Sequence, residues 1–134
     1  MEAETKVQKI EPLPVPADAH RHYPLIRDYK AAYVAKGPAL RDHGEKEAVK
    51  YLAAWILHLN EWSNVDRRMT PNQIVETAEI LYVENSFRRI PEIVFVFLEG
   101  KKGHYGQTYN VMSGMIICSW FEKYREDLMR GFPI

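Results

Sequence analysis

The chain has 134 residues, of which 46% are hydrophobic and 12% aromatic, enough to bury a sizeable core in one domain. Its 18 basic and 18 acidic residues give a net charge of zero and are spread over both halves, which excludes a basic arm and an acidic tail. The apolar runs are shorter than the ~20 residues that span a bilayer. The single cysteine, Cys118, excludes an internal disulfide and favours a reducing compartment, so we expect a cytoplasmic protein.

The first 17 residues begin with a polar stretch and continue with prolines at positions 12, 14 and 16. Proline has no N–H and favours an extended backbone. We therefore predict that residues 1–17 form an extended tail and that residues 18–134 form a single helical domain. The alternative is that the tail is a strap laid on the domain or a peptide offered to a partner.

A first helix is predicted over residues 24–36, because Pro24 suits the first helical position and Gly37 with Pro38 ends the pattern. Asp18, His20 and His22 lie just before it, and alternate residues of an extended segment share a face. No fourth ligand is visible nearby. We expect ordinary solvated histidines here, with no metal and no cofactor.

A second helix is predicted over residues 45–62, with Trp55 and Trp62 broadening its apolar face. Residues 63–69 form a linker and a candidate subdomain boundary. Thr70 and Pro71 then predict the cap and first residue of a third helix. Glu76 and Glu79 on that helix lack the histidine three residues later that di-iron bundles require, so a solvated face is expected.

Residues 86–89 are predicted to form a turn, and Pro91 opens a run of β-branched and aromatic residues that ends at Gly100. A buried strand is compatible with this run, but we favour a short buried helix. Three glycines then mark a connector, and a last helix starts near Asn110 or Ser113 and stops at Gly131. The fold class is therefore all-α, a small bundle of four to five helices with an extended N-terminal tail.

The last helix should bury Trp120 and Phe121, and it carries Cys118 as a small packing residue. Together with the connector, it forms the pattern G-x-Y-G-x-x-Y followed by G-x-x-I-x-x-W-[FL]-x-x-Y. The residues that match are Gly103, Tyr105, Gly106, Tyr109, Gly114, Ile117, Trp120, Phe121 and Tyr124.

This pattern resembles a family of small uncharacterised proteins from prophages and conjugative elements of gut bacteria, and the resemblance covers about residues 69–130. The resemblance implies a helix at the run after Pro91 and, through its mobile-element setting, a role in replication. The family often has Asp-Gly before the last helix, where this chain has Ser113 and Gly114. Because Ser replaces Asp readily as a helix cap, this difference argues against catalysis at that position.

Basic pairs recur in three successive connectors, and two tyrosines follow the last pair. If the connectors gather at one end of the bundle, they could hold phosphates and stack a base; scattered surface charge is the alternative. The candidate nucleic-acid-binding residues are Arg67, Arg68, Arg88, Arg89, Lys101, Lys102, His104, Tyr105 and Tyr109.

Catalytic signatures are missing from the sequence. The tetrad at residues 100–103 matches the GxxG loop of KH domains without their flanking pattern, and no G-K-[ST], HExxH or GxSxG motif occurs. We therefore expect a non-enzymatic, nucleic-acid-associated accessory protein of a mobile element. The alternative function is a protein–protein adaptor or a small homo-oligomer that binds no nucleic acid.

Overall fold

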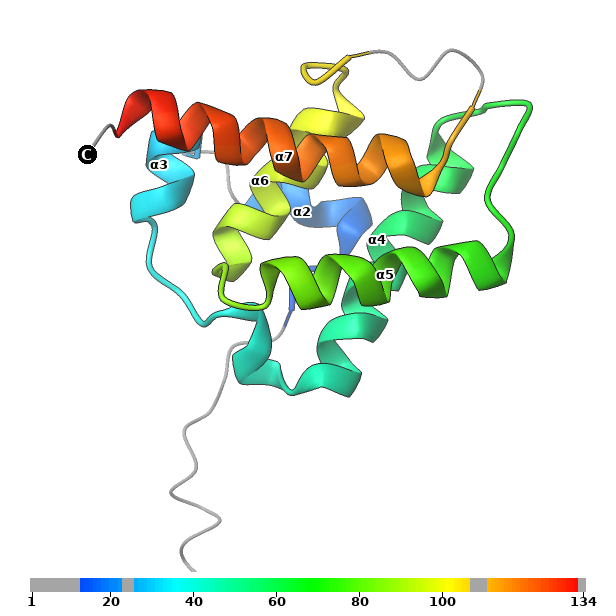
Figure 1. Ribbon diagram of the computed structural model, residues 1–134, viewed down its shortest axis with the longest axis horizontal. Helices are drawn as coiled ribbons and strands as arrows, with labels where there is room; N and C mark the ends of the chain where they lie inside the picture. Colours follow the sequence, from blue (N-terminus) through cyan, green and yellow to red (C-terminus); the bar gives the residue numbers. More distant parts are fainter. Residues whose placement is uncertain (1–12, 23–25, 107–110, 133–134) are drawn as a thin grey trace, which may run out of the picture.

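The computed structural model describes residues 13–22, 26–106 and 111–132, and the regular elements in these ranges are helices joined by loops (Figure 1). It contains no β-strand there, only two isolated bridges that join Ala39 to Arg89 and Arg67 to Val111. The all-α class is confirmed. In chain order the elements are the 3₁₀ turn η1 (Pro16–Asp18), α2 (Ala19–His22), α3 (Tyr29–Val34), the 3₁₀ turn η2 (Leu40–His43), α4 (Glu45–Trp62), α5 (Pro71–Asn85), α6 (Ile90–Lys101) and α7 (Gly114–Gly131).

Two long helices, α5 and α7, run side by side across the front of Figure 1 in the same direction, and α6 passes behind them. On the other side α5 packs against α4, and α6 also contacts the short helix α3. Gly114 permits the close approach of α5 and α7, because a Cβ at that position would lie 2.4 Å from the Thr77 hydroxyl. The four longer helices thus enclose one core.

Capping side chains define the helix starts as the sequence predicts. The Thr70 hydroxyl accepts from the Gln73 N–H, and the Gln73 side chain accepts from the Thr70 N–H. Ser113 caps α7 by accepting from the Ile116 N–H. The helix predicted over residues 24–36 is shorter in the structure, because Asp28 caps α3 one residue before Tyr29. Its predicted start at Pro24 and the alternative cap at Asn110 lie outside the described residues.

The run after Pro91 is a helix, so the strand alternative is wrong. Ile93, Val94, Val96 and Phe97 are all fully buried, as expected for a helix that other elements surround. Gly100 lies inside α6 rather than in the connector that follows it. It is needed for packing, because a Cβ there would lie 2.2 Å from the Trp120 ring. Gly103 and Gly106, at φ of 85° and 114°, do provide the turn.

A single cluster of buried side chains extends from Ala19 to Tyr124 and includes Trp120 and Phe121 as predicted. The core is continuous across the predicted boundary at residues 63–69, where Val65 and Met69 are buried. Leu13, within the predicted tail, is partly buried against the same core. In the described ranges, every helix is too short or too polar to span a bilayer.

Candidate functional site

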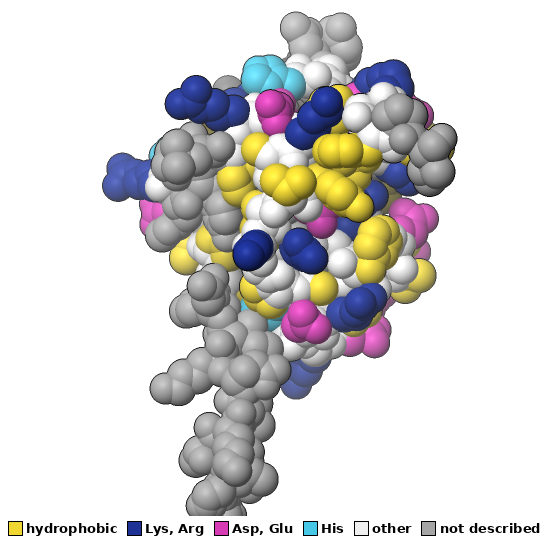
Figure 2. Space-filling model, turned by 90° about the vertical axis from the view of Figure 1, so that its left-hand side faces the viewer, with side chains coloured by type: hydrophobic (Ala, Val, Ile, Leu, Met, Phe, Trp, Pro, Cys, Tyr) yellow, Lys and Arg dark blue, Asp and Glu magenta, His cyan; other side chains and the backbone are white. Residues whose placement is uncertain are grey.

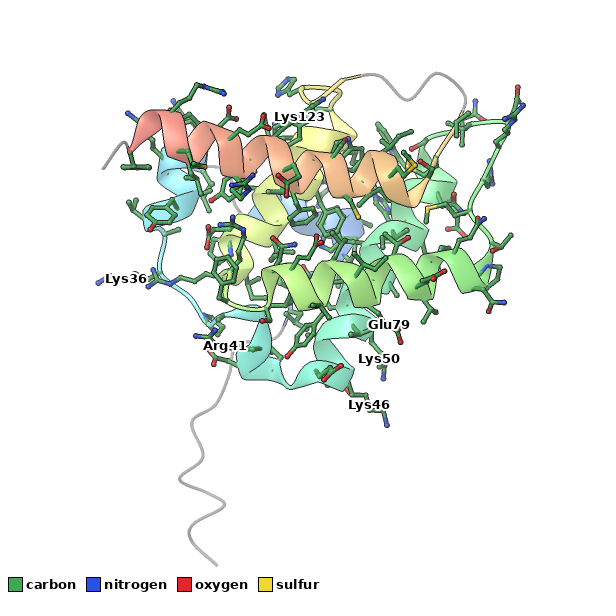
Figure 3. The ribbon with its side chains drawn as sticks, viewed as in Figure 1. Lys36, Arg41, Lys46, Lys50, Glu79 and Lys123 are labelled. Carbon is green, nitrogen blue, oxygen red and sulfur yellow. The ribbon has the colours of Figure 1, made fainter. Side chains whose placement is uncertain are left out.

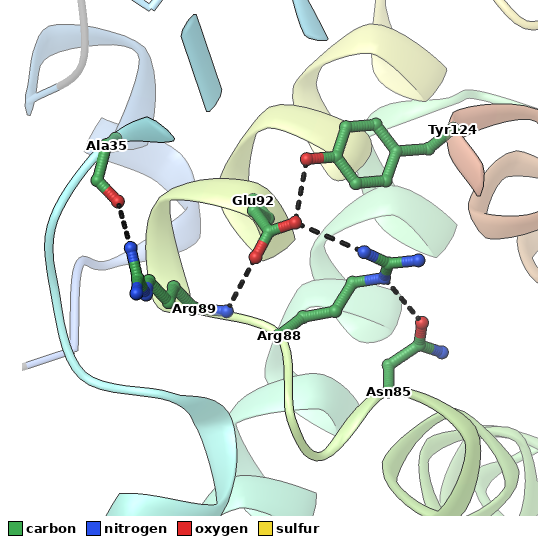
Figure 4. A network of polar contacts seen from close by, with 6 residues as sticks. All are labelled: Ala35, Asn85, Arg88, Arg89, Glu92 and Tyr124. Atoms are coloured by element: carbon green, nitrogen blue, oxygen red, sulfur yellow. Dashed lines mark hydrogen bonds and ion pairs between the residues drawn. The ribbon is translucent and has the colours of Figure 1, made fainter. Parts of the chain in front are cut away.

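Arg88 belongs to the interior and not to a phosphate-binding surface. Its guanidinium lies 3.1 Å from the Glu92 carboxylate and donates to the Asn85 side chain at 3.2 Å, and Tyr124 donates its hydroxyl proton to the same carboxylate at 2.8 Å (Figure 4). The ion pair is about 6% exposed on either side chain. A buried charge is tolerated only when it is paired and hydrogen-bonded, so Arg88 is committed to this network. Its prediction as a nucleic-acid contact is wrong.

Tyr105 is likewise a core residue. The residue is 9% exposed, and burial raises the pKa of its phenol above the ordinary value. Lys123 donates to its backbone carbonyl and ties the turn to α7. A buried ring cannot stack on a base, so this part of the predicted site is also wrong. Tyr109, the second predicted stacking residue, lies outside the described residues.

The remaining basic pairs do not converge. Arg67 and Arg68 lie in the α4–α5 loop and line a groove of about 440 Å³ beside the start of α7. Arg89 is exposed elsewhere and donates to the Ala35 carbonyl (Figure 4). On the face drawn in Figure 2, basic side chains are scattered among acidic and hydrophobic ones. The predicted residues therefore do not form one basic surface.

Glu99 engages two of the predicted residues at the end of α6. Its carboxylate oxygens lie 3.1 Å from the Lys102 ammonium and 2.7 Å from the His104 ring. The side chains of Lys102 and His104 are both more than half exposed, so their contacts with Glu99 are weak. Lys102 and His104 are thus accessible, and the charge of Lys102 is partly neutralised.

The ammonium of Lys101 lies over an aromatic ring and beside a histidine. The ammonium lies 4.6 Å from the centre of the Trp62 ring and 3.0 Å from Nε2 of His58. Trp62 closes α4 with 55% of its surface exposed, whereas Trp55 and Trp120 are buried. An exposed tryptophan held beneath an ammonium group is the most distinctive polar and aromatic arrangement on the described surface.

A hollow of about 570 Å³ opens beside this ring. It lies between the N-terminal segment around α2, the end of α4 and the last turns of α6. The residues that line it are His20, Ile26, Arg27, Trp62, Phe95, Leu98, Glu99, Lys101 and Lys102. Its floor is apolar and its rim is cationic, which suits a ligand that combines a flat apolar group with a negative charge.

The positive charge of the hollow is only partly neutralised from within, because Glu99 pairs with Lys102 alone among its lysines and arginine. Neither Arg27 nor Lys101 forms an ion pair with another described residue. Burial lowers the pKa of Lys101, and burial followed by the repulsion from Lys101 lowers the pKa of His58. An anion placed in the hollow would favour the charged forms of both groups, because opposite charge stabilises ionisation.

Sequence reasoning missed Trp62 and His58. Trp62 continues the apolar spacing of α4, three residues after the buried Leu59, so it reads as core. It is exposed because α4 ends there and the chain turns away. His58 reads as a pair with Glu61, yet its hydrogen-bonded neighbour is Lys101, 43 positions along the chain. Of the residues around this ring, the sequence suggested only Lys101 and Lys102, through the basic pairs of the connectors.

The described residues offer little to metal or thiol chemistry. No three His, Cys, Asp or Glu side chains among them are close enough to hold a metal ion. Cys118 is half-buried, and burial together with the nearby Glu84 raises the pKa of its thiol. A raised pKa disfavours the nucleophilic thiolate, in agreement with a packing role.

Comparison of the chain with models of protein families, with curated proteins and with solved structures finds no match.

Proposed function

We propose that the chain is a non-enzymatic accessory protein that binds single-stranded nucleic acid in the hollow between α2, α4 and α6. The observation that carries the proposal is the exposed Trp62 ring beneath the Lys101 ammonium. Stacking of a base on an aromatic side chain contributes about 1–3 kcal/mol and is independent of sequence. A phosphate of the same strand would meet Lys101, with Arg27 and Lys102 at the rim.

This site differs from the one predicted from the sequence in its stacking residue, but it includes two of the predicted lysines. Lys101 and Lys102 stay in the site, Trp62 takes the place of Tyr105, and Arg27 is added. The preference for single strands follows from the stacking platform, since bases in a duplex already stack on one another. The resemblance to proteins of prophages and conjugative elements supports a role in the replication of such an element in the cytoplasm.

The charge of the hollow is tested by reversing it. Lys101→Glu with Lys102→Glu should weaken the binding of a fluorescent oligothymidylate at least about tenfold and flatten the dependence of affinity on salt. Lys46→Glu with Lys50→Glu is the matched control, because both lysines are exposed on the first turns of α4, at the opposite end of that helix (Figure 3). Anisotropy measures binding, and thermal melting shows that each variant is folded.

The stacking role is tested on Trp62 itself. Because Trp55 and Trp120 are buried, quenching of tryptophan fluorescence by an oligonucleotide reports on Trp62. Trp62→Ala should abolish the quenching and weaken single-strand binding more than duplex binding. Unchanged binding by folded Trp62→Ala and double-lysine variants would eliminate the hollow as the nucleic-acid site. No binding of oligothymidylate by the unaltered chain would leave the protein adaptor as the function.

A further inference from the structure

The outward face of α5 carries an apolar row where a solvent-facing helix normally carries polar side chains. Ile80, Val83 and Phe87 are 45%, 76% and 53% exposed. Ile80 and Val83 lie on the side of α5 away from the buried face formed by Ile74, Thr77, Ala78, Leu81 and Asn85. Phe87 lies in the turn that follows the end of α5 at Asn85 and extends the row beyond the helix. The row therefore contributes nothing to the core and is available to a partner.

Acidic residues flank this row on both sides. Glu79 lies on one side of the stripe, Glu84 on the other, and Glu76 continues it toward the helix start, all of them exposed. No lysine or arginine occurs between Pro71 and Asn85, and none of the three carboxylates is paired with another described residue. Along α5 itself the face is thus negative, and the arginines nearest to it, Arg67 with Arg68 and Arg89, line the hollows at its two ends.

Hollows lie at both ends of the row. One, of about 380 Å³, is lined by Phe87 with Tyr33 and Val34 of α3 and by the charged residues Arg88, Arg89 and Glu92. The other is the groove that Ile80 forms with Met115 of α7, closed at its far end by Arg67 and Arg68. The Arg88 guanidinium stacks 4.9 Å from the centre of the Phe87 ring and holds it in place. Figure 2 shows hydrophobic side chains gathered over α3 and the end of α7, next to the first of these hollows.

We propose that Ile80, Val83 and Phe87, with the acidic residues beside them, bind a basic amphipathic helix of a partner protein. A helix that docks in a groove presents apolar anchors at i, i+3 or i+4 and i+7, and such anchors would contact Ile80 and Val83 of α5 and Phe87 of the turn after it. The two hollows receive the outer anchors, and an aromatic side chain fixed by its neighbour is a typical centre of binding energy. Lysines or arginines beside the anchors of the partner meet Glu79 and Glu84.

Synthetic peptides test the chemistry of this face. The probe is an acetylated and amidated peptide with leucines at the anchor positions and lysines elsewhere. A peptide with glutamates in place of lysines and a scrambled lysine peptide are its references. Anisotropy should show binding of the probe alone, and amide NMR shifts should change around residues 76–87. Equal binding of the scrambled peptide, or shifts elsewhere on the protein, would overturn the proposal.

Two variants separate the apolar and acidic contributions. Ile80→Gln with Val83→Gln should weaken probe binding at least about tenfold, and Glu79→Lys with Glu84→Lys should transfer the preference to the glutamate peptide. Glu47→Lys with Glu126→Lys is the charge-matched control, since both side chains are exposed and lie outside the row. Thermal melting confirms that each variant is folded.

Two further measurements distinguish binding of a partner helix at this face from nucleic-acid binding in the hollow and from dimerisation of the chain. Oligothymidylate binding should be unchanged in Ile80→Gln with Val83→Gln, whereas probe binding should be unchanged in Lys101→Glu with Lys102→Glu. Sedimentation of the unliganded chain should show no dimer that depends on Ile80 and Val83. A dimer abolished by their replacement would assign the face to a second copy of the chain and overturn the proposal.

Discussion

Arg88 and Arg89 are adjacent residues of the same type in opposite environments. Arg88 is buried between the rings of Phe87 and Tyr124 and is paired with Glu92, whereas Arg89 is exposed. The hydrogen bond from the Arg89 N–H to Glu92 caps the start of α6, so one carboxylate serves both residues. At the residue scale, the environment and not the residue type separates a structural cation from one that a ligand can reach.

We predict that Arg88→Ala lowers the free energy of unfolding by about 3–5 kcal/mol, because it leaves the Glu92 carboxylate buried without its counterion. Arg89→Ala should change it by no more than about 0.5 kcal/mol, as is usual for an exposed side chain. Urea denaturation followed by circular dichroism measures both. Similar losses for the two variants would contradict the buried network.

The pairing of α6 with α7 depends on one missing side chain at the element scale. Gly100 gives the Trp120 ring a place against the α6 backbone, and that contact joins the last turns of α6 to the middle of α7. The same part of α6 carries Lys101 and thereby positions the ammonium over Trp62. The core contact and the candidate site therefore share a turn of helix.

We predict that Gly100→Ala destabilises the chain by about 1–3 kcal/mol, the usual cost of overpacking a core. Gly103→Asn is the control, because its position at φ of 85° has open space around it and asparagine tolerates that conformation. It should cost much less than Gly100→Ala. Thermal melting compares the two, and a neutral Gly100→Ala would show that α6 and α7 are packed more loosely than described.

At the scale of the whole molecule, the loop between α4 and α5 belongs to the core. The Asn60 side chain accepts from the Met69 N–H at 2.9 Å and donates to the Met69 carbonyl at 3.0 Å. Val65 and Met69 are buried between these helices. The loop thus links the helices before and after it instead of separating two parts.

We predict a single cooperative unfolding transition. Far-UV circular dichroism and tryptophan fluorescence should give the same midpoint, since Trp55 of α4 and Trp120 of α7 report on opposite sides of residues 63–69. Asn60→Ala should lower that midpoint without splitting the transition. Two separate transitions would support the subdomain boundary that the sequence suggested at residues 63–69.

Local patterns in the sequence determined the helices and most of the core. The bounds of α4, the capping of α5 by Thr70 and the burial of Trp120 and Phe121 follow from spacing and capping, which act within one or two turns. Several residues of the motif that carries the family resemblance are buried, among them Tyr105, Ile117 and Tyr124. These residues stabilise the fold.

The candidate surfaces were decided only by the tertiary structure. The surroundings of a cationic side chain depend on residues of other helices. Tyr124 of α7 contacts Arg88, and His58 of α4 contacts Lys101. Trp62 and the row of Ile80, Val83 and Phe87 are exposed because no other described element covers them. The sequence does not distinguish an apolar residue that is covered from one that is exposed. Helical periodicity identifies apolar positions, but only packing shows which of them stay open to a partner.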